Sequence, residues 1–172
     1  MLTLLPYDRA AAVAYAHKWA YGRNPEFYDY EKIGGDCTNF ASQCIYAGSG
    51  IMNYTPTFGW YYIDANQKAP AWTGVPYLYQ FLTRTGLSVG PVARETEIDA
   101  LLPGDILQLS FTGEEFQHSP VVVSVGNPAT PENILLAAHS YDADNRPLAT
   151  YDYQKARFLH ISGVLRPLSR NS

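Results

Sequence analysis

The hydrophobic pattern of this chain changes near residue 103, and that change constrains the fold more than any other feature. Before it, apolar residues recur every three or four positions, which is typical of amphipathic helices. After it, β-branched and apolar runs are separated by turn signals, which predict strands. Helices first and strands second predict an α+β fold, in which N-terminal helices pack on a C-terminal antiparallel sheet.

The helix that carries both cysteines has the clearest pattern. It follows a glycine pair at residues 34–35, with Asp36 as a good N-cap and Gly48 or Gly50 as a natural end, so Cys37 lies on its first turn. Its apolar stripe consists of Cys37, Phe40, Ala41, Cys44 and Ile45.

Three other segments complete the first half of the chain. An alanine-rich helix is predicted over residues 7–21, where apolar side chains are spaced by four. Residues 51–75 are predicted to form an ordered irregular loop rich in aromatic residues, and a short helix is expected around residues 76–85.

The second half predicts neighbouring strands joined as antiparallel hairpins. If the loop over residues 126–132 is symmetrical, His118 faces residue 140, one position from His139, and a single bulge would bring the two histidines opposite each other. Pro120 indicates that its strand is locally unpaired or at an edge. The predicted strands are 106–111, 117–125, 134–141 and 158–165, with turn signals at 112–113, 126–128 and 145–147.

Length and charge narrow the classes of protein to consider. With 172 residues and 47% hydrophobic content, the chain can bury one core, so we expect a single domain over 1–172, helical to about residue 100 and sheet over about 101–168. A net charge of -4 without a Lys/Arg run gives no electrostatic reason to bind nucleic acid. No apolar stretch approaches the roughly 18 residues of a membrane span, so we expect no membrane insertion.

The sequence leaves compartment and oligomeric state open. The first six residues lack a basic leader, and their apolar run is too short for a signal peptide. A chain whose leader had been removed would act in the cell envelope or outside the cell, and otherwise it would act in the cytoplasm.

The two cysteines are expected to be free thiols. Cys37 and Cys44 are too few for a disulfide framework or a four-cysteine zinc site. On one helix they are separated by about 10 Å of rise, beyond the roughly 7 Å limit for a disulfide. We expect neither a metal nor an organic cofactor.

Cys37 is the candidate nucleophile. A catalytic thiol needs a lowered pKa and a base, and the dipole and free N–H groups of a helix N-terminus favour both a thiolate and an oxyanion. Cys44 lies two turns inside the helix, where the dipole helps little. The alternative for Cys37 is a small buried hydrophobe in the apolar stripe.

His118 is the candidate base among four histidines, because it begins a strand and can face the helix end. Its alternative is a strand-end residue bonded to a turn carbonyl. His139 could accept the N–H of His118 and fix its tautomer. Asp142 and Asn145 compete for that orienting role, and His139 could instead be a core histidine satisfied by the backbone.

These residues also carry a resemblance. The run from Gly34 to Cys44, with Trp60-Tyr61-Tyr62, Gly104-Asp105-Ile106, His118-Ser119 and His139-Ser140, resembles the bacterial putative amidase domain family, itself similar to papain-like NlpC/P60 cell-wall peptidases. The resemblance extends from about residue 7 to residue 165. It implies a papain-like fold and an amide substrate in cell-wall peptide or a related small peptide.

The resemblance also assigns residues. It implies that Cys37 is the nucleophile, that His118 is the base, and that the orienting residue comes from the next strand, at His139. The matching Asp of similar peptidases binds a substrate amine, so Asp36 is either such a ligand or a helix N-cap.

Two tryptophans are candidates for the substrate groove. Trp60 and Trp72 could wall a groove or anchor their own loop. The sequence therefore favours a cysteine amidohydrolase working through a thioester at Cys37, with His118 as general base. The alternatives are a glycan- or peptide-binding module without catalysis, and an acyltransferase that uses the same two residues.

Overall fold

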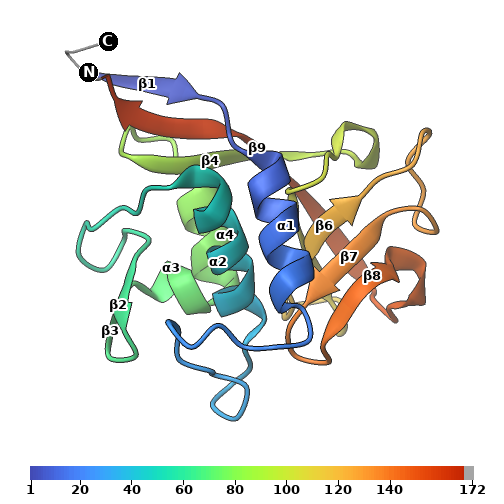
Figure 1. Ribbon diagram of the computed structural model, residues 1–172. Helices are drawn as coiled ribbons and strands as arrows, with labels where there is room; N and C mark the ends of the chain where they lie inside the picture. The colour runs from blue at the N-terminus through green and yellow to red at the C-terminus, as the bar shows by residue number, and fades with distance from the viewer. Residues whose placement is uncertain (169–172) are drawn as a thin grey trace.

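The computed structural model describes residues 1–168, in which one antiparallel sheet of seven strands packs against four helices. In Figure 1 the helices lie together, with β6, β7 and β8 on one side and β1, β4 and β9 above them. The helices are α1 (Arg9–Trp19), α2 (Cys37–Ser49), α3 (Pro70–Thr73) and α4 (Val75–Leu82). The strands of the main sheet are β1 (Leu2–Leu5), β4 (Gly90–Thr96), β5 (Ile106–Ser110), β6 (Val121–Ser124), β7 (Leu135–Ala138), β8 (Ala143–Pro147) and β9 (Lys155–Pro167).

The long strand β9 organises the sheet. The strand order is β1-β9-β5-β6-β7-β8, and β4 pairs with β9 as well. Because β9 has 13 residues, it can pair with three other strands along its length. The smaller elements are a hairpin of β2 (Tyr62–Asp64) and β3 (Gln67–Lys68) and two 3-10 turns, η1 (Ile98–Ala100) and η2 (Leu148–Thr150).

Both faces of the sheet are buried, and side chains along each strand point alternately to one face and the other. Val121 and Ala137 belong to the large core cluster shared with α1, α2 and α4, whereas Val122 and Leu136 belong to a second cluster with Leu148. Successive strand residues point to opposite faces, so the two clusters lie on opposite sides of the sheet. No helix in the described part of the chain is long and apolar enough to cross a membrane.

A buried carboxylate joins the sheet to α1. Asp105 has no exposed surface, and its oxygens accept from Arg9 Nη1 at 2.7 Å and from the backbone N–H groups of Ile161 at 2.9 Å and Leu102 at 2.8 Å. The ring nitrogen Nδ1 of His160 lies 3.0 Å from the same carboxylate. We call Asp105, Arg9 and His160 the Asp105 anchor, because it holds the start of β5 against β9 and the beginning of α1.

The α+β class and the packing of helices on an antiparallel sheet are confirmed. The cysteine helix begins at Cys37 as predicted and ends at Ser49, and its C-cap Gly50 has the left-handed conformation with φ 69°. The first helix is shorter than the predicted 7–21, and the helix expected near 76–85 is α4. The single-domain prediction over 1–172 includes residues 169–172, which lie outside the described residues.

Several strand predictions are wrong. The helical part also supplies β1 and β4, and residues 51–75 contain β2, β3 and α3 instead of only loop. Residues 145–147, predicted as a turn, lie in β8, and the last strand pairs with β5 and not with its predecessor in sequence. The pairings of β9 with β1, β4 and β5 join segments far apart in the chain, so local turn signals cannot specify them.

The predicted register of the central hairpin is correct. Val121 pairs with Ala137 and Val122 with Leu136, which extrapolates to residue 140 opposite His118. The bulge in this hairpin lies between Val122 and Ser124, on the far side from His118. It therefore does not bring His118 opposite His139.

Candidate functional site

The glycine pair before α2 lets the chain turn sharply into the helix. Gly34 and Gly35 have φ of 93° and 102°, a region that favours glycine. A Cβ at Gly35 would lie 3.1 Å from Ser140 Oγ, which accepts the backbone N–H of Asp36 at 3.0 Å. The start of α2 is therefore tied closely to the end of β7, and Cys37 is placed on the first turn.

The structure brings the Cys37 thiol against the segment that carries His118. Cys37 Sγ lies 4.0 Å from the carbonyl oxygen of Gln117 and 3.7 Å from Thr38 Oγ1. Thr38 Oγ1 is in turn 3.1 Å from Ser119 Oγ. Burial raises the pKa of the Cys37 thiol, although hydrogen bonds to Thr38 and to the Ser119 backbone oppose the increase. Both Cys37 and Cys44 are free thiols.

His118 is buried but its ring nitrogens have no hydrogen-bond partner within residues 1–168. The residue is 6% exposed, and its backbone is fixed by the bridge to Leu109, whose N–H donates to the His118 carbonyl at 3.0 Å. Burial lowers the pKa of His118 to about 4, and the positive charge of Arg146 adds to that effect. The imidazole is therefore neutral at pH 7, with a lone pair free to accept a proton.

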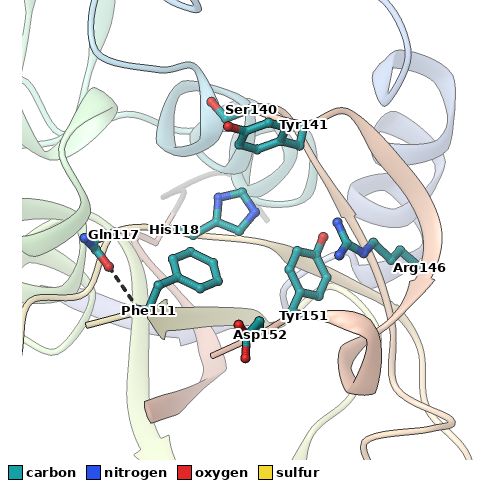
Figure 2. Close-up of a pocket in the computed structure, with 8 residues that line it drawn as sticks. All are labelled: Phe111, Gln117, His118, Ser140, Tyr141, Arg146, Tyr151 and Asp152. Carbon is teal, nitrogen blue, oxygen red and sulfur yellow. Dashed lines mark hydrogen bonds between the residues drawn. The ribbon is translucent and has the colours of Figure 1, made fainter. Parts of the chain in front are cut away.

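His118 opens into a pocket of about 460 Å³. Figure 2 shows its ring in the middle of the pocket, facing Tyr141 and Tyr151. Cys37 does not line this pocket, but its sulfur contacts the carbonyl of Gln117, which does. The lining residues are Phe111, Gln117, His118, Ser140, Tyr141, Arg146, Tyr151 and Asp152.

His139 does not orient His118. Its Nδ1 lies 2.5 Å from Asp36 Oδ2 and its Nε2 lies 2.8 Å from the carbonyl oxygen of Trp19, so both ring nitrogens are occupied. The ring also stacks on Phe40, with the centroids 4.1 Å apart. His139 therefore joins the beginning of α2 to the end of α1, and this role corrects the predicted one.

Asp36 is neither a side-chain cap nor accessible to a substrate amine. Its carboxylate makes no capping bond to the helix backbone and has no exposed surface. Besides His139, it accepts from the Tyr30 N–H at 2.8 Å and from Asn39 Nδ2 at 2.9 Å. Asp36 does occupy the N-cap position of α2, as predicted, but without a side-chain capping bond. The predicted contact with a substrate amine is corrected, because the buried carboxylate holds together the segments around the Cys37 turn.

The two tryptophans belong to the core. Trp60 and Trp72 have no exposed surface, and their ring centroids are 4.8 Å apart. Trp60 Nε1 donates to Ser42 Oγ at 3.0 Å, and Trp72 Nε1 donates to Asn39 Oδ1 at 2.9 Å. They therefore pack against α2 and do not wall a groove.

The other predicted orienting residues also lie elsewhere. Asp142 pairs with Arg23 at 2.9 Å, and Asn145 is a strand residue with φ of 53°. Sequence reasoning missed Arg146 and Tyr151, which line the pocket with His118. The only local signal is the sequence around Arg146, which is also typical of a turn.

Comparison with known proteins places the chain in a family. Residues 6–162 match the family model described as "Putative amidase domain", a description that indicates amide hydrolysis. The chain is also 32% identical over 143 residues to the "Uncharacterized protein YhbB" of Bacillus subtilis (strain 168), covering 81% of this chain and 43% of that relative. It thus spans less than half of the relative's length. No solved structure matches the chain. Because the family model matches most of the sequence, the chain belongs to the family described as "Putative amidase domain".

Proposed function

We propose that this protein is a cysteine amidohydrolase of papain-like fold, in which Cys37 is the nucleophile and His118 the general base. The observation that carries the proposal is the juxtaposition at the start of α2. There the Cys37 sulfur contacts the Gln117 carbonyl, and the next residue, His118, presents an imidazole without a hydrogen-bond partner in residues 1–168 to a pocket of about 460 Å³. The family description supports an amide as the substrate.

The resting site holds two neutral groups. Burial raises the pKa of Cys37 and lowers the pKa of His118 to about 4, so a thiol and an imidazole are the forms present at pH 7. The proton then moves from sulfur to His118 as the sulfur attacks the amide carbon. The first-turn N–H groups of α2 have no intrahelical acceptor and can stabilise the oxyanion.

The remaining steps return the enzyme to its starting state. The C–N bond breaks, the amine leaves with the proton held by His118, and the acyl group remains on Cys37 as a thioester. His118 then removes a proton from water, which attacks the thioester and releases a carboxylic acid and the thiol. An amine in place of water would give acyl transfer with the same residues. The proposed substrate is an amide bond in cell-wall peptide or a related small peptide.

Selective substitution and alkylation test this mechanism. The wild type and Cys44→Ala should release amine from a panel of short peptides, whereas Cys37→Ala and His118→Gln should lose about 100-fold or more of the rate. Iodoacetamide should label the single thiol of Cys44→Ala faster than that of Cys37→Ala, because Cys44 has no exposed surface. Full activity in Cys37→Ala, or faster labelling of Cys44, would overturn the mechanism.

A second candidate, a peptide-binding module without turnover, is favoured by the neutral state of the two groups. A thiol with a raised pKa is a weak nucleophile unless substrate binding brings its base into use. This candidate predicts saturable peptide binding by both the wild type and Cys37→Ala, and no amine released by either.

A further inference from the structure

Arg146 is a cation on the wall of the pocket without a carboxylate partner. In residues 1–168 its guanidinium forms no ion pair. Its Nε donates to Thr150 Oγ1 at 2.8 Å and its Nη2 donates to the Thr150 carbonyl at 3.0 Å. Within these residues, Nη1 has no hydrogen-bond acceptor. The guanidinium carbon lies 3.7 Å from the centroid of the Tyr151 ring. Figure 2 shows this group beside Tyr151, across the pocket from His118.

The Tyr151 hydroxyl is a second unsatisfied group at the same place. Tyr151 is 9% exposed, and its hydroxyl is one of two buried side-chain polar atoms without a hydrogen-bond partner in the described part of the chain. Burial raises the pKa of Tyr151, although the neighbouring Arg146 opposes the increase, so the hydroxyl keeps its proton at pH 7 and can donate. An unpaired buried hydroxyl destabilises the folded protein, and a ligand acceptor would remove that cost.

In residues 1–168, none of the neighbouring carboxylates forms an ion pair with Arg146. Asp142 and Asp144 are paired with Arg23 and His17, at 2.9 Å and 2.8 Å. Asp152 lines the pocket but forms no ion pair with Arg146. The remaining walls are mainly aromatic, from Phe111 and Tyr141. One cation beside one acidic residue suits a singly charged anion better than a doubly charged phosphate.

From these contacts we propose that the pocket selects a peptide substrate with a free carboxylate beside the scissile amide. Arg146 pairs with this carboxylate, and the Tyr151 hydroxyl donates a hydrogen bond to it. This inference rests on the proposed function, because it names the substrate class of the same site. Guanidinium is suited to carboxylate, since its N–H groups can form charge-assisted hydrogen bonds with both oxygens. The aromatic walls would cover the aliphatic part of the substrate residue that bears the carboxylate.

Binding can be measured without turnover by using the Cys37→Ala variant of the full chain. Calorimetry would compare three N-acetylated tripeptides: Ac-Ala-Glu-Ala-NH2, its neutral Gln counterpart Ac-Ala-Gln-Ala-NH2, and Ac-Ala-Gln-Ala-OH, whose carboxylate is terminal. At least one acidic peptide should bind about 10- to 100-fold more tightly than the neutral one. The acidic peptide that binds more tightly identifies a side-chain or a terminal carboxylate as the source.

Substitutions then assign the preference to Arg146. Adding Arg146→Gln to Cys37→Ala should reduce the preference to about twofold or less, while Arg146→Lys should keep part of it because the charge remains. Arg94→Gln is the matched control, since Arg94 is exposed on β4 and does not line the pocket. Thermal unfolding would establish that each variant is folded. Equal affinity for acidic and neutral peptides, no binding of either acidic peptide at millimolar concentration, or an unchanged preference in Arg146→Gln would overturn this inference.

The outcome also separates this inference from the proposed function. Arg146-dependent binding of acidic peptides, with no amine released by the wild type, would retain the carboxylate site and reject the hydrolase. Hydrolysis of neutral and acidic peptides at equal rates would retain the hydrolase and reject the carboxylate site.

Discussion

The Asp105 anchor and the His118 pocket differ in whether their buried polar groups have hydrogen-bond partners. In the anchor, the Asp105 carboxylate accepts from Arg9 and from two backbone N–H groups, and it also contacts a ring nitrogen of His160. In the pocket, the His118 ring and the Tyr151 hydroxyl have no partner in the described residues. Buried polar groups are usually paired, so the unpaired ones mark where a ligand can complete the structure.

The histidines show the same contrast. His17, His139 and His160 each lie within 3.0 Å of a carboxylate, whereas His118 has no ion pair in residues 1–168. The three paired rings fix segments of the chain relative to one another. His118 is held instead through its backbone bridge to Leu109, which leaves the ring free for chemistry. A lack of stabilising contacts can therefore indicate function.

Substitution of His118 should give the largest effect and should separate activity from stability. His118→Gln removes the proposed base and should lower the rate of amide hydrolysis about 10²- to 10⁴-fold. Its free energy of unfolding should change by about 1 kcal/mol or less, because the ring makes no hydrogen bond to any described residue. Steady-state kinetics and urea unfolding measure the two quantities. A large loss of stability would place His118 with the paired histidines.

Asp105→Ala should show the opposite pattern. It leaves Arg9 and His160 without their buried partner and should lower the free energy of unfolding by about 3–5 kcal/mol. Urea unfolding of Asp105→Ala measures the loss, and Asp152→Ala is the control because Asp152 is exposed. A loss below about 1 kcal/mol would show that the anchor is not a major source of stability.

The sequence predicts the parts of the site that local patterns determine. The start of α2 at Cys37 follows from the glycine pair and the apolar stripe, and the β6–β7 register follows from the centre of the loop between these strands. Pro120 lacks an N–H, and β6 begins at the following residue. Each of these features depends on neighbours within a few positions or on one short hairpin.

The rest of the site depends on contacts between distant segments. The partner of His139 is Asp36, 103 residues away, and no periodicity relates them. Arg146 reaches the pocket because its segment continues the sheet as β8, although its sequence is also typical of a turn. Burial decides the roles of Trp60 and Trp72, since aromatic residues suit a groove wall and a core equally well.

The low pKa of His118 predicts an acid-sensitive contribution to stability. His118 has a pKa of about 4 in the folded protein and about 6.5 when unfolded. Its contribution is therefore unaffected above about pH 6.5, and about 3 kcal/mol is lost as the pH falls to about 4, because protons then bind the unfolded chain. Urea unfolding at pH 7 and pH 4, compared between the wild type and His118→Gln, isolates this loss. Equal pH dependence in both proteins would show that His118 binds a proton as easily in the folded protein as in the unfolded chain.

The smallest expected effect distinguishes two buried tyrosines. Tyr7 donates to the Gly104 carbonyl at 3.0 Å beside the Asp105 anchor, whereas Tyr151 has no partner in the described residues. Tyr7→Phe should therefore lower the free energy of unfolding by about 1 kcal/mol, and Tyr151→Phe should leave it unchanged or raise it by about 1 kcal/mol. Urea unfolding of the two variants side by side measures the difference in sign. If Tyr151→Phe were as destabilising as Tyr7→Phe, its hydroxyl would already be satisfied in the free protein, and the contrast between the anchor and the pocket would fail at this residue.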